Sequence, residues 1–451
     1  MEGDEWYHRV APTDAALARV ELRGNRAHER HDAADTPSST IAPDVSTAGP
    51  PQCANRARRA AQRRKPQAWE IHTRVAVVHD WLDTWRGGEM VLAEILRIYP
   101  DADLFALVDF LPQADRGALN GKRATTSFLQ RVPFARAGFR MLLPLFPRAI
   151  ESLDVSAYDL VISSSHAVAK GARSRPGQVH ICYCYTPMRY AWDLHDQYLT
   201  QTGLDRGLRG FVAKRMLARL RAWDRAASER VDHFVAISQY IAERIRRSYG
   251  RDSSVIYPPV AVEPVEPTPP RAAHYVTVSQ LVPYKRVDLI VEAFRLMPER
   301  ELVVIGEGPE HARISAIAPR NVRMLGRLPD AERNRWLAGA RAFVFAAAED
   351  FGIAPLEAQA LGTPVIAYAG GAASETIRGL DASMPSGVLY GEQSAAAIAN
   401  AVAEFEHNES RIAANACRQN AQRFEPSRFR REFRDFVDAR LSGSHAAATH
   451  R

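Results

Sequence analysis

The chain is poor in cysteine and has no long apolar run. Its 451 residues include four cysteines, too few and too scattered for a disulfide framework: Cys53, Cys182, Cys184 and Cys417. The longest uninterrupted apolar runs, such as Met141–Phe146, fall far short of the ~20 residues that span a bilayer. We therefore expect a reduced, cytoplasmic protein without a membrane span.

Metal-ligand spacing is also missing. Cys182-x-Cys184 lacks the second pair of a zinc site. Asp101-Ala-Asp103 resembles an Asp-x-Asp metal pair, but it follows Tyr-Pro, where aspartates commonly serve turn geometry. The sequence therefore predicts no metal site and no bound cofactor.

The composition indicates a soluble globular protein with an excess of basic residues. Hydrophobic residues make up 46% and charged residues 25% of the chain, and the net charge is +7. The length predicts two lobes of roughly 150 to 200 residues each. The basic excess favours polyanionic surroundings, which leaves nucleic acid, an anionic membrane surface and phosphorylated ligands open.

Residues 1–72 have no apolar periodicity and little to bury. The stretch from Arg56 to Lys65 carries six cations and no acid. A solvated basic tail or an over-extended start site fits this composition better than an RNA- or lipid-binding arm. We therefore predict a disordered basic arm and expect no nucleic-acid partner.

From residue 73 the chain alternates short apolar runs with helical patterns, which is typical of a parallel sheet. Arg74–Asp80 reads as a strand, and a loop with Gly87 and Gly88 leads into a helix. Further strands are expected at 159–163, 179–183 and 233–237. This pattern predicts a first Rossmann-like domain over 73–257.

A second domain follows a proline-rich linker at 258–273. Five more strands are expected in 274–425, at 275–278, 302–305, 322–325, 342–345 and 365–368. An amphipathic helix over 426–442 and a disordered tail over 443–451 complete the prediction. Two α/β lobes with doubly wound parallel sheets would face each other across one ligand-binding cleft.

The most informative segment is Glu349-Asp-Phe-Gly-Ile-Ala-Pro-Leu-Glu357, followed by Gly362-Thr-Pro-Val-Ile. It reads as a loop, a helix and a strand, and a glycine loop before a helix presents free N–H groups to an anion. Two glutamates eight residues apart also occur as solvated helix charges. In this context, however, the segment resembles the Glu-x7-Glu signature of the family 4 retaining glycosyltransferases.

The resemblance covers about residues 74–440 and implies a GT-B fold with the acceptor on the first domain, 73–257, and the nucleotide sugar on the second domain. It implies that Glu349 and the backbone of Asp350, Phe351 and Gly352 hold the donor sugar, and that Glu357 binds the ribose hydroxyls. Neither glutamate needs to be a nucleophile, because enzymes of this type are thought to let the departing phosphate take the acceptor proton. The expected activity is that of a retaining, metal-independent hexosyltransferase.

Other residues gain donor-binding roles through the same resemblance. Lys285 and Arg286 would balance the donor diphosphate, and Gln280 stands where the family usually has arginine. Gly308 and Leu328 would line the nucleotide pocket, and Gly87 with Gly88 would lie over the diphosphate. Without the motif, the Lys-Arg pair and the glycine turns are also consistent with a helix start and ordinary turns.

The first lobe also resembles bacterial mannosyltransferases that build O-antigen and exopolysaccharide chains. The matching segments are Ser163-Ser-Ser-His166 and the run from Cys182 to Asp193, which includes Tyr185 and Arg189. Many relatives have histidine at the position of Tyr185, where it would contact the transferred sugar. We therefore expect Tyr185, His166 and Arg189 near the sugar or acceptor; an ordinary hydrogen-bonded histidine at a strand end is the alternative for His166.

Two segments, 134–144 and 204–230, interleave bulky apolar residues with cations. They resemble an interfacial helix, which would suit a lipid-linked acceptor at the inner face of the cytoplasmic membrane. An ordinary basic helix packed on the sheet is the alternative.

The resemblance favours transfer of mannose from GDP-mannose to a lipid-linked or oligosaccharide acceptor. A UDP-sugar transferase, a sugar-nucleotide 2-epimerase and a catalytically silent carbohydrate-binding GT-B scaffold remain open.

Overall fold

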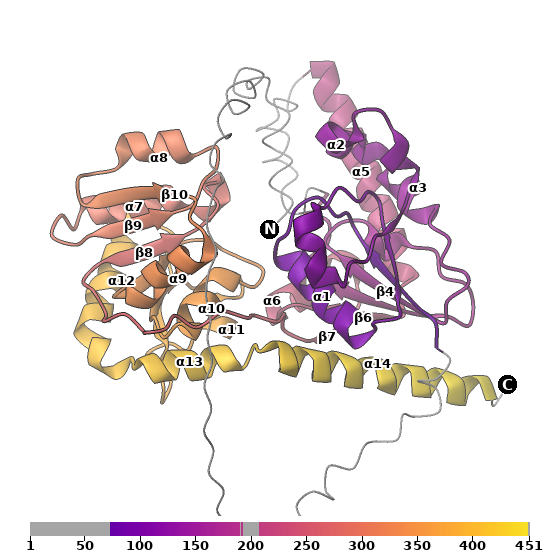
Figure 1. Cartoon of the computed structure of the whole chain (residues 1–451). Helices are drawn as coiled ribbons and strands as arrows, with labels where there is room; N and C mark the ends of the chain where they lie inside the picture. Colours follow the sequence, from indigo (N-terminus) through magenta and orange to yellow (C-terminus); the bar gives the residue numbers. More distant parts are fainter. Residues whose placement is uncertain (1–72, 190, 193–206, 450–451) are drawn as a thin grey trace, which may run out of the picture. The chain divides into compact units, whose positions relative to one another are not determined.

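The computed structural model describes residues 73–189, 191–192 and 207–449. The predicted basic arm over 1–72 lies outside these residues. Within them, the chain forms two separate parallel sheets with helices on both faces (Figure 1). The predicted α/β fold class is confirmed.

The first lobe is built on a seven-stranded sheet in the order β3-β2-β1-β4-β5-β6-β7, and every neighbouring pair is parallel. Its strands are β1 Val75–His79, β2 Asp103–Ala106, β3 Thr125–Thr126, β4 Leu160–Ser165, β5 Val179–Cys184, β6 His233–Ala236 and β7 Ser253–Val255. All residues of β1, β4 and β5 are buried. Burial is therefore continuous rather than alternating along these strands, because helices cover both faces.

The main helices of the first lobe are α1 Gly87–Ile98, α2 Ala135–Gly138, α3 Phe146–Glu151, α5 Gly207–Glu229 and α6 Gln239–Tyr249. Short 3₁₀ turns lie between them: η3 Gln113–Leu119, η4 Phe128–Arg131, η5 Phe139–Leu145 and η6 Ala169–Gly171. The predicted loop of Gly87 and Gly88 is in fact the first turn of α1. Arg86 precedes it, and Glu89 accepts a hydrogen bond from the Arg86 N–H (3.0 Å). This capping interaction, which needs an acid three residues after the cap, starts the helix at the glycines.

The second lobe is built on a six-stranded parallel sheet in the order β10-β9-β8-β11-β12-β13. Its strands are β8 Tyr275–Val278, β9 Leu302–Ile305, β10 Val322–Gly326, β11 Ala342–Phe345, β12 Val365–Tyr368 and β13 Gly387–Tyr390. The five predicted strands are confirmed, and β13 was not predicted. A Cβ at Gly387 would lie 2.1 Å from the carbonyl oxygen of Val365, so glycine is what lets β13 pair there.

The helices of the second lobe are α7 Val287–Arg295, α8 His311–Ile317, α9 Asp330–Gly339, α10 Ile353–Ala360, α11 Ala373–Thr376, α12 Ala395–Asn408 and α13 Ala414–Gln422. The turns η7 Pro283–Lys285 and η8 Glu409–Arg411 complete it. Each sheet reverses its strand order once, between β1 and β4 and between β8 and β11. Ligands of such folds bind beyond the carboxyl ends of the strands at these reversals.

The final helix, α14 Pro426–Thr449, follows the second lobe but packs on the first (Figure 1). The rings of Phe429 and Phe433 lie 5.6 and 5.9 Å from the ring of Tyr183 on β5, and Arg430 pairs with Glu94 of α1. The sequence predicted that this helix ends at residue 442. It continues to Thr449 because the alanines after residue 445 favour helix.

Candidate active site

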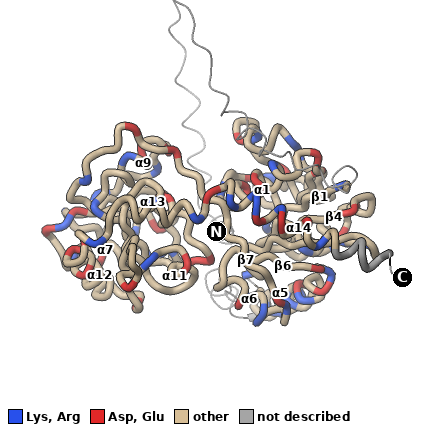
Figure 2. Tube along the Cα trace, turned by 90° about the horizontal axis from the view of Figure 1, so that it is seen from below, with Lys and Arg blue, Asp and Glu red and all other residues tan. Residues whose placement is uncertain are grey.

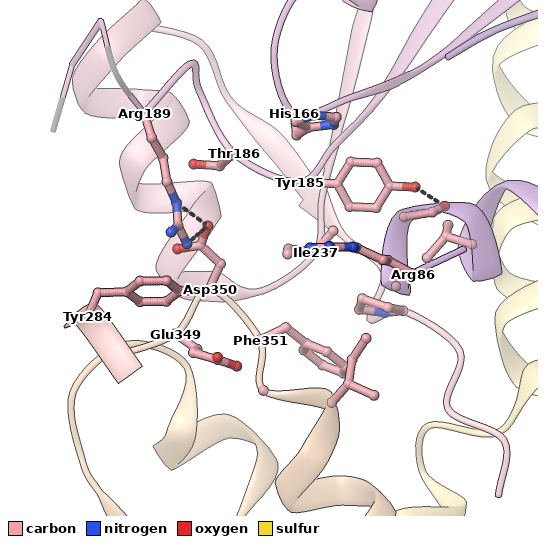
Figure 3. A pocket seen from close by; sticks show the side chains of 16 residues that line it. Arg86, His166, Tyr185, Thr186, Arg189, Ile237, Tyr284, Glu349, Asp350 and Phe351 are labelled. Carbon is pink, nitrogen blue, oxygen red and sulfur yellow. Dashed lines mark hydrogen bonds and ion pairs between the residues drawn. The ribbon is translucent and has the colours of Figure 1, made fainter. Parts of the chain in front are cut away.

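A cavity lies beyond the carboxyl ends of both sheets and takes lining residues from both lobes (Figure 3). Nine predicted site residues line it: Gly87, Gly88, His166, Tyr185, Arg189, Glu349, Asp350, Phe351 and Gly352. The loops after β4, β5 and β11 and the start of α1 supply them. The topology therefore brings together residues that are more than 260 positions apart in the sequence.

Lys285 and Glu349 form a buried ion pair that joins two loops of the second lobe. Lys285 ends η7, after β8, and Glu349 follows β11, the neighbouring strand. Their side chains are 7% and 8% exposed. Glu349 lines the main cavity, whereas the predicted Lys285 is not among the lining residues and adjoins the cavity through this pair. Lys285 places a fixed positive charge next to the carboxylate.

Asp350 connects the two lobes through its side chain (Figure 3). It accepts hydrogen bonds from Arg189 Nη2 at 2.6 Å and Arg244 Nη1 at 2.9 Å, and its backbone carbonyl accepts one from Ser238 Oγ. Burial raises the pKa of Asp350, but the two guanidinium groups outweigh it and lower the pKa overall. The resemblance implied that the backbone of Asp350 holds the donor sugar. In the structure, the side chain of Asp350 links the two lobes.

Gly352 and Phe351 shape the turn into α10. Gly352 has φ 87°, a left-handed conformation that favours glycine, and the first N–H groups of α10 follow it. The ring of Phe351 packs 5.6 Å from Phe424 and 6.1 Å from Tyr257. This packing fixes the turn against the end of the second lobe.

Arg286 does not point into this cavity as predicted. It has φ 52° at the start of α7, and its Nε lies 3.3 Å from Asp288 of the same helix. The left-handed turn separates its side chain from that of Lys285. Arg286 instead lines a second cavity with Tyr284 and Arg313.

The remaining predicted donor-binding residues also lie on the second lobe, outside the lining of the main cavity. Glu357 on α10 has Arg333 at 3.7 Å, and burial raises its pKa. Leu328 packs against the core beside β8 and β10. A Cβ at Gly308 would lie 2.3 Å from the carbonyl oxygen of Leu281, so this glycine supports the loop that carries Gln280, whose carbonyl accepts the Val282 N–H.

His166 lines the cavity but is held from behind by Asp80. The carboxylate of Asp80 accepts four backbone N–H groups from residues 166–169, at 2.6 to 3.0 Å, and lies 2.9 Å from His166 Nδ1. Burial raises the pKa of Asp80, but its electrostatic interaction and hydrogen bonds with His166 lower it strongly overall. Asp80 therefore fixes the imidazole ring that was predicted to lie near the sugar.

Tyr185 lines the cavity, and its hydroxyl is hydrogen-bonded to other residues of the first lobe (Figure 3). The hydroxyl donates to the carbonyl oxygen of Gly88 at 3.0 Å and lies 2.8 Å from Ser164 Oγ. Any sugar contact of Tyr185 in this state would be made through its ring.

Sequence reasoning missed several residues of the site. Arg86, Thr186 and Tyr284 line the cavity, and Arg244 and Glu375 join the lobes. Both carboxylate oxygens of Glu375 accept backbone N–H groups at the start of α6, from Gln239 and Tyr240. Thr186 could have been predicted, because it is a polar residue near the end of an expected strand. No local sequence pattern indicated a role for Arg244 or Glu375.

Neither a membrane span nor a metal site is found among the described residues. Every helix of this part of the chain is too short or too polar to cross a bilayer. In the same residues, no group of three or more histidine, cysteine or acidic side chains is arranged to hold a metal ion. Asp103 of the Asp-x-Asp pair begins β2 and accepts a hydrogen bond from Tyr158 Oη at 2.7 Å.

Two curated relatives match part of the chain. A GDP-mannose-dependent monoacylated alpha-(1-6)-phosphatidylinositol monomannoside mannosyltransferase of Corynebacterium glutamicum is 30% identical over 178 residues, which cover 33% of this chain and 47% of that protein. A phosphatidyl-myo-inositol mannosyltransferase of Propionibacterium freudenreichii subsp. shermanii is 38% identical over 91 residues, 19% of this chain and 22% of that protein. The chain thus spans less than half the length of either relative.

The matches to a solved structure and to two family models cover a larger share of this chain than the two relatives do. The crystal structure of Anabaena HepE in complex with UDP and glucose matches with a TM-score of 0.58 and 18% identity, over 81% of this chain and 100% of that one. Residues 85–264 match the model described as Glycosyltransferase Family 4, and residues 263–424 match the model described as Glycosyl transferases group 1. The chain therefore belongs to the family 4 glycosyltransferases and has their GT-B fold.

Proposed function

We propose that this protein is a retaining hexosyltransferase that transfers mannose from GDP-mannose to a lipid-linked or oligosaccharide acceptor in cell-surface polysaccharide synthesis. The observation that carries the proposal is the buried pair of Lys285 and Glu349, of which Glu349 lines the cavity beside the start of α10. It combines one fixed cation, one carboxylate and free helix N–H groups, which are the groups that a sugar diphosphate requires.

Each of these groups has a role in transfer. Lys285 and the first N–H groups of α10 stabilise negative charge on the diphosphate as the bond to the sugar breaks. Glu349 accepts hydrogen bonds from sugar hydroxyls, and Glu357 accepts those of the ribose. The acceptor hydroxyl attacks from the same face, and its proton passes to the departing phosphate oxygen. No protein nucleophile is required.

The choice of donor and acceptor draws support from the relatives. Both are described as mannosyltransferases, one of them GDP-mannose-dependent, and both descriptions name phosphatidylinositol lipids. HepE, whose structure holds UDP and glucose, supports the alternative of a UDP-sugar donor through fold alone. No described side chain distinguishes guanine from uracil by geometry.

We also propose a peripheral contact with the inner face of the cytoplasmic membrane. Eight large hydrophobic residues are exposed in the described part of the chain, and six of them lie within 128–145 and 211–212: Phe128, Phe134, Met141, Leu145, Phe211 and Val212. Phe134 is 89% and Phe211 66% exposed. The cations Arg148, Arg215 and Arg219 line a groove with Phe211 and Val212. Apolar side chains ringed by cations suit an anionic lipid surface.

Charge reversal on α5 tests this contact. The substitutions Arg215→Glu and Arg219→Glu change exposed side chains, whereas Arg221 donates to the Ala191 carbonyl and is left unchanged. We expect the variant to lose cosedimentation with vesicles that contain phosphatidylglycerol. Arg246→Glu with Arg247→Glu on α6 is a matched control, because it makes the same charge change on another exposed basic helix (Figure 2). Equal pelleting of both variants and the wild type would reject the contact.

Transfer itself is tested with labelled donors. Wild-type protein is incubated with labelled GDP-mannose or UDP-glucose, membrane lipid extract and EDTA. We expect label from GDP-mannose alone to enter the organic phase, and α-mannosidase to release it, as retention of configuration requires. Glu349→Ala should abolish the signal. Transfer from UDP-glucose alone would replace GDP-mannose as the donor. Full transfer by Glu349→Ala would reject the role of Glu349, and no transfer by the wild type would favour the silent scaffold.

A further inference from the structure

We propose that a closed ring of polar contacts in the first lobe holds the first turn of α1 in its place over the donor, and that Tyr185 is a positioning residue within it. The ring consists of Tyr185, Ser164, His79 and Glu89, and it closes through Gly88, the chain neighbour of Glu89. Its atoms come from β1, β4, the end of β5 and α1.

The contacts run in one unbroken path. Tyr185 Oη lies 3.0 Å from the Gly88 carbonyl oxygen and 2.8 Å from Ser164 Oγ. Ser164 Oγ lies 3.0 Å from His79 Nδ1, and His79 Nε2 lies 3.5 Å from Glu89 Oε1. Glu89 Oε2 then accepts the Arg86 N–H at 3.0 Å. Both ends of the path therefore hold the segment from Arg86 to Glu89.

Donor and acceptor chemistry gives the path a single direction. The Gly88 carbonyl only accepts, so the Tyr185 hydroxyl donates to it and accepts from Ser164. Ser164 then accepts from His79 Nδ1–H. The last contact, between His79 Nε2 and Glu89 Oε1 at 3.5 Å, is longer than a hydrogen bond and closes the ring by electrostatic proximity. Every member thus fixes the orientation of the next.

Burial makes this arrangement costly to break. His79, Ser164 and Glu89 have no exposed surface. Removing one member leaves its neighbour's polar atom buried without its partner, which is unfavourable inside a protein. Gly87 and Gly88 have no side chains of their own to anchor the turn, so the ring supplies the anchorage.

Two conservative substitutions cut the ring, and each has a matched control. Tyr185→Phe and Ser164→Ala remove one hydroxyl each. Tyr183→Phe removes a hydroxyl that donates to the Ile256 carbonyl, and Ser163→Ala removes one that pairs with His180. The control residues lie on the same strands but outside the ring and the cavity.

Hydrogen exchange of the unliganded full-length protein is the first readout. We expect faster exchange in the peptide that spans residues 84–92 for Tyr185→Phe, Ser164→Ala and Glu89→Gln, and no change for the two controls. Glu89→Gln keeps the shape of the cap but replaces the carboxylate that faces His79 with a neutral amide. Equal exchange in ring variants and controls would overturn the proposal, and this readout requires no substrate.

Kinetics provides the second readout and rests on the proposed function. We expect kcat to fall about tenfold in Tyr185→Phe and in Ser164→Ala, with nucleotide affinity within threefold of wild type, because one hydrogen bond of ordinary strength is lost. The double variant should be no worse than either single variant, since one break opens the ring. Additive losses of kcat in the double variant would contradict the ring. A wild type without transfer activity would reject the proposed function, while the exchange result would still decide on the ring.

Discussion

The two lobes use their polar residues in different ways at the cavity. The second lobe places ion pairs there or nearby, with Lys285 beside Glu349 and Arg333 beside Glu357. The first lobe turns its polar groups inward, so that Asp80 binds four backbone N–H groups and Tyr185 binds Ser164 and Gly88. The difference indicates a division of labour in which the second lobe provides charge and the first lobe provides geometry.

The contacts between the lobes combine charges from both. Arg189 and Arg244 of the first lobe donate to the carboxylate of Asp350 of the second lobe. Glu375 of the second lobe accepts two N–H groups at the start of α6. Opposite charges therefore join the two halves of the cavity.

The largest effect is expected from loss of Lys285, the partner of Glu349. Lys285→Met removes the cation that stabilises the departing diphosphate, and we expect kcat/KM for transfer to fall by about 10² to 10³. Steady-state kinetics with labelled donor measures it. Arg286→Met is the matched control, because its side chain faces Asp288, and it should retain activity within a few fold. Equal losses in both variants would contradict the assignment of charge to Lys285.

A smaller, pH-dependent effect is expected at Glu357. Burial raises the pKa of this carboxyl above its usual 4.5, so it becomes protonated at a higher pH than an exposed glutamate. We expect nucleotide affinity to fall as the pH drops through that raised pKa, since the neutral acid is a poorer acceptor for ribose hydroxyls. Glu357→Gln should bind about tenfold more weakly at pH 7 and lose this pH dependence. An unchanged pH profile in the variant would remove Glu357 from the nucleotide site.

The last effect concerns the stability of the first lobe rather than ligand binding. Burial lowers the pKa of His180 from 6.5 to about 4. Between pH 6.5 and pH 4 the unfolded chain therefore binds more protons at His180 than the folded chain does. The free energy of unfolding falls as the pH drops from 6.5 towards 4, by on the order of 3 kcal/mol. Denaturant unfolding at pH 7 and pH 5 checks this. His180→Gln should show a weaker dependence on pH, and equal slopes in both proteins would count against a neutral buried imidazole.

The sequence was sufficient for most of the sheet architecture. Strands such as β9 and β11 are short apolar runs between polar turns, and their bounds match the prediction. β13 escaped notice because it begins with glycine, and β2 because it begins with Asp103, so neither has the full apolar run of a buried strand. The amphipathic pattern of α14 showed which face is buried but not which lobe covers it.

The site was predictable where it depends on a motif and unpredictable where it depends on backbone direction. Glu349 and Gly352 follow from one continuous segment. Arg286 was placed at the cavity because it follows Lys285, but its left-handed φ turns the side chain away. The role of Arg244 depends on contacts across the two lobes, which no local pattern encodes.

Titration calorimetry with GDP, UDP, ADP, GDP-mannose and UDP-glucose tests the division between the lobes most directly. It should be run on the wild type, Lys285→Met and Tyr185→Phe without added metal. We expect the wild type to bind GDP and GDP-mannose selectively, Lys285→Met to lose most of this affinity, and Tyr185→Phe to retain it within threefold. The absence of nucleotide binding by the wild type, or equal losses in the two variants, would contradict the account.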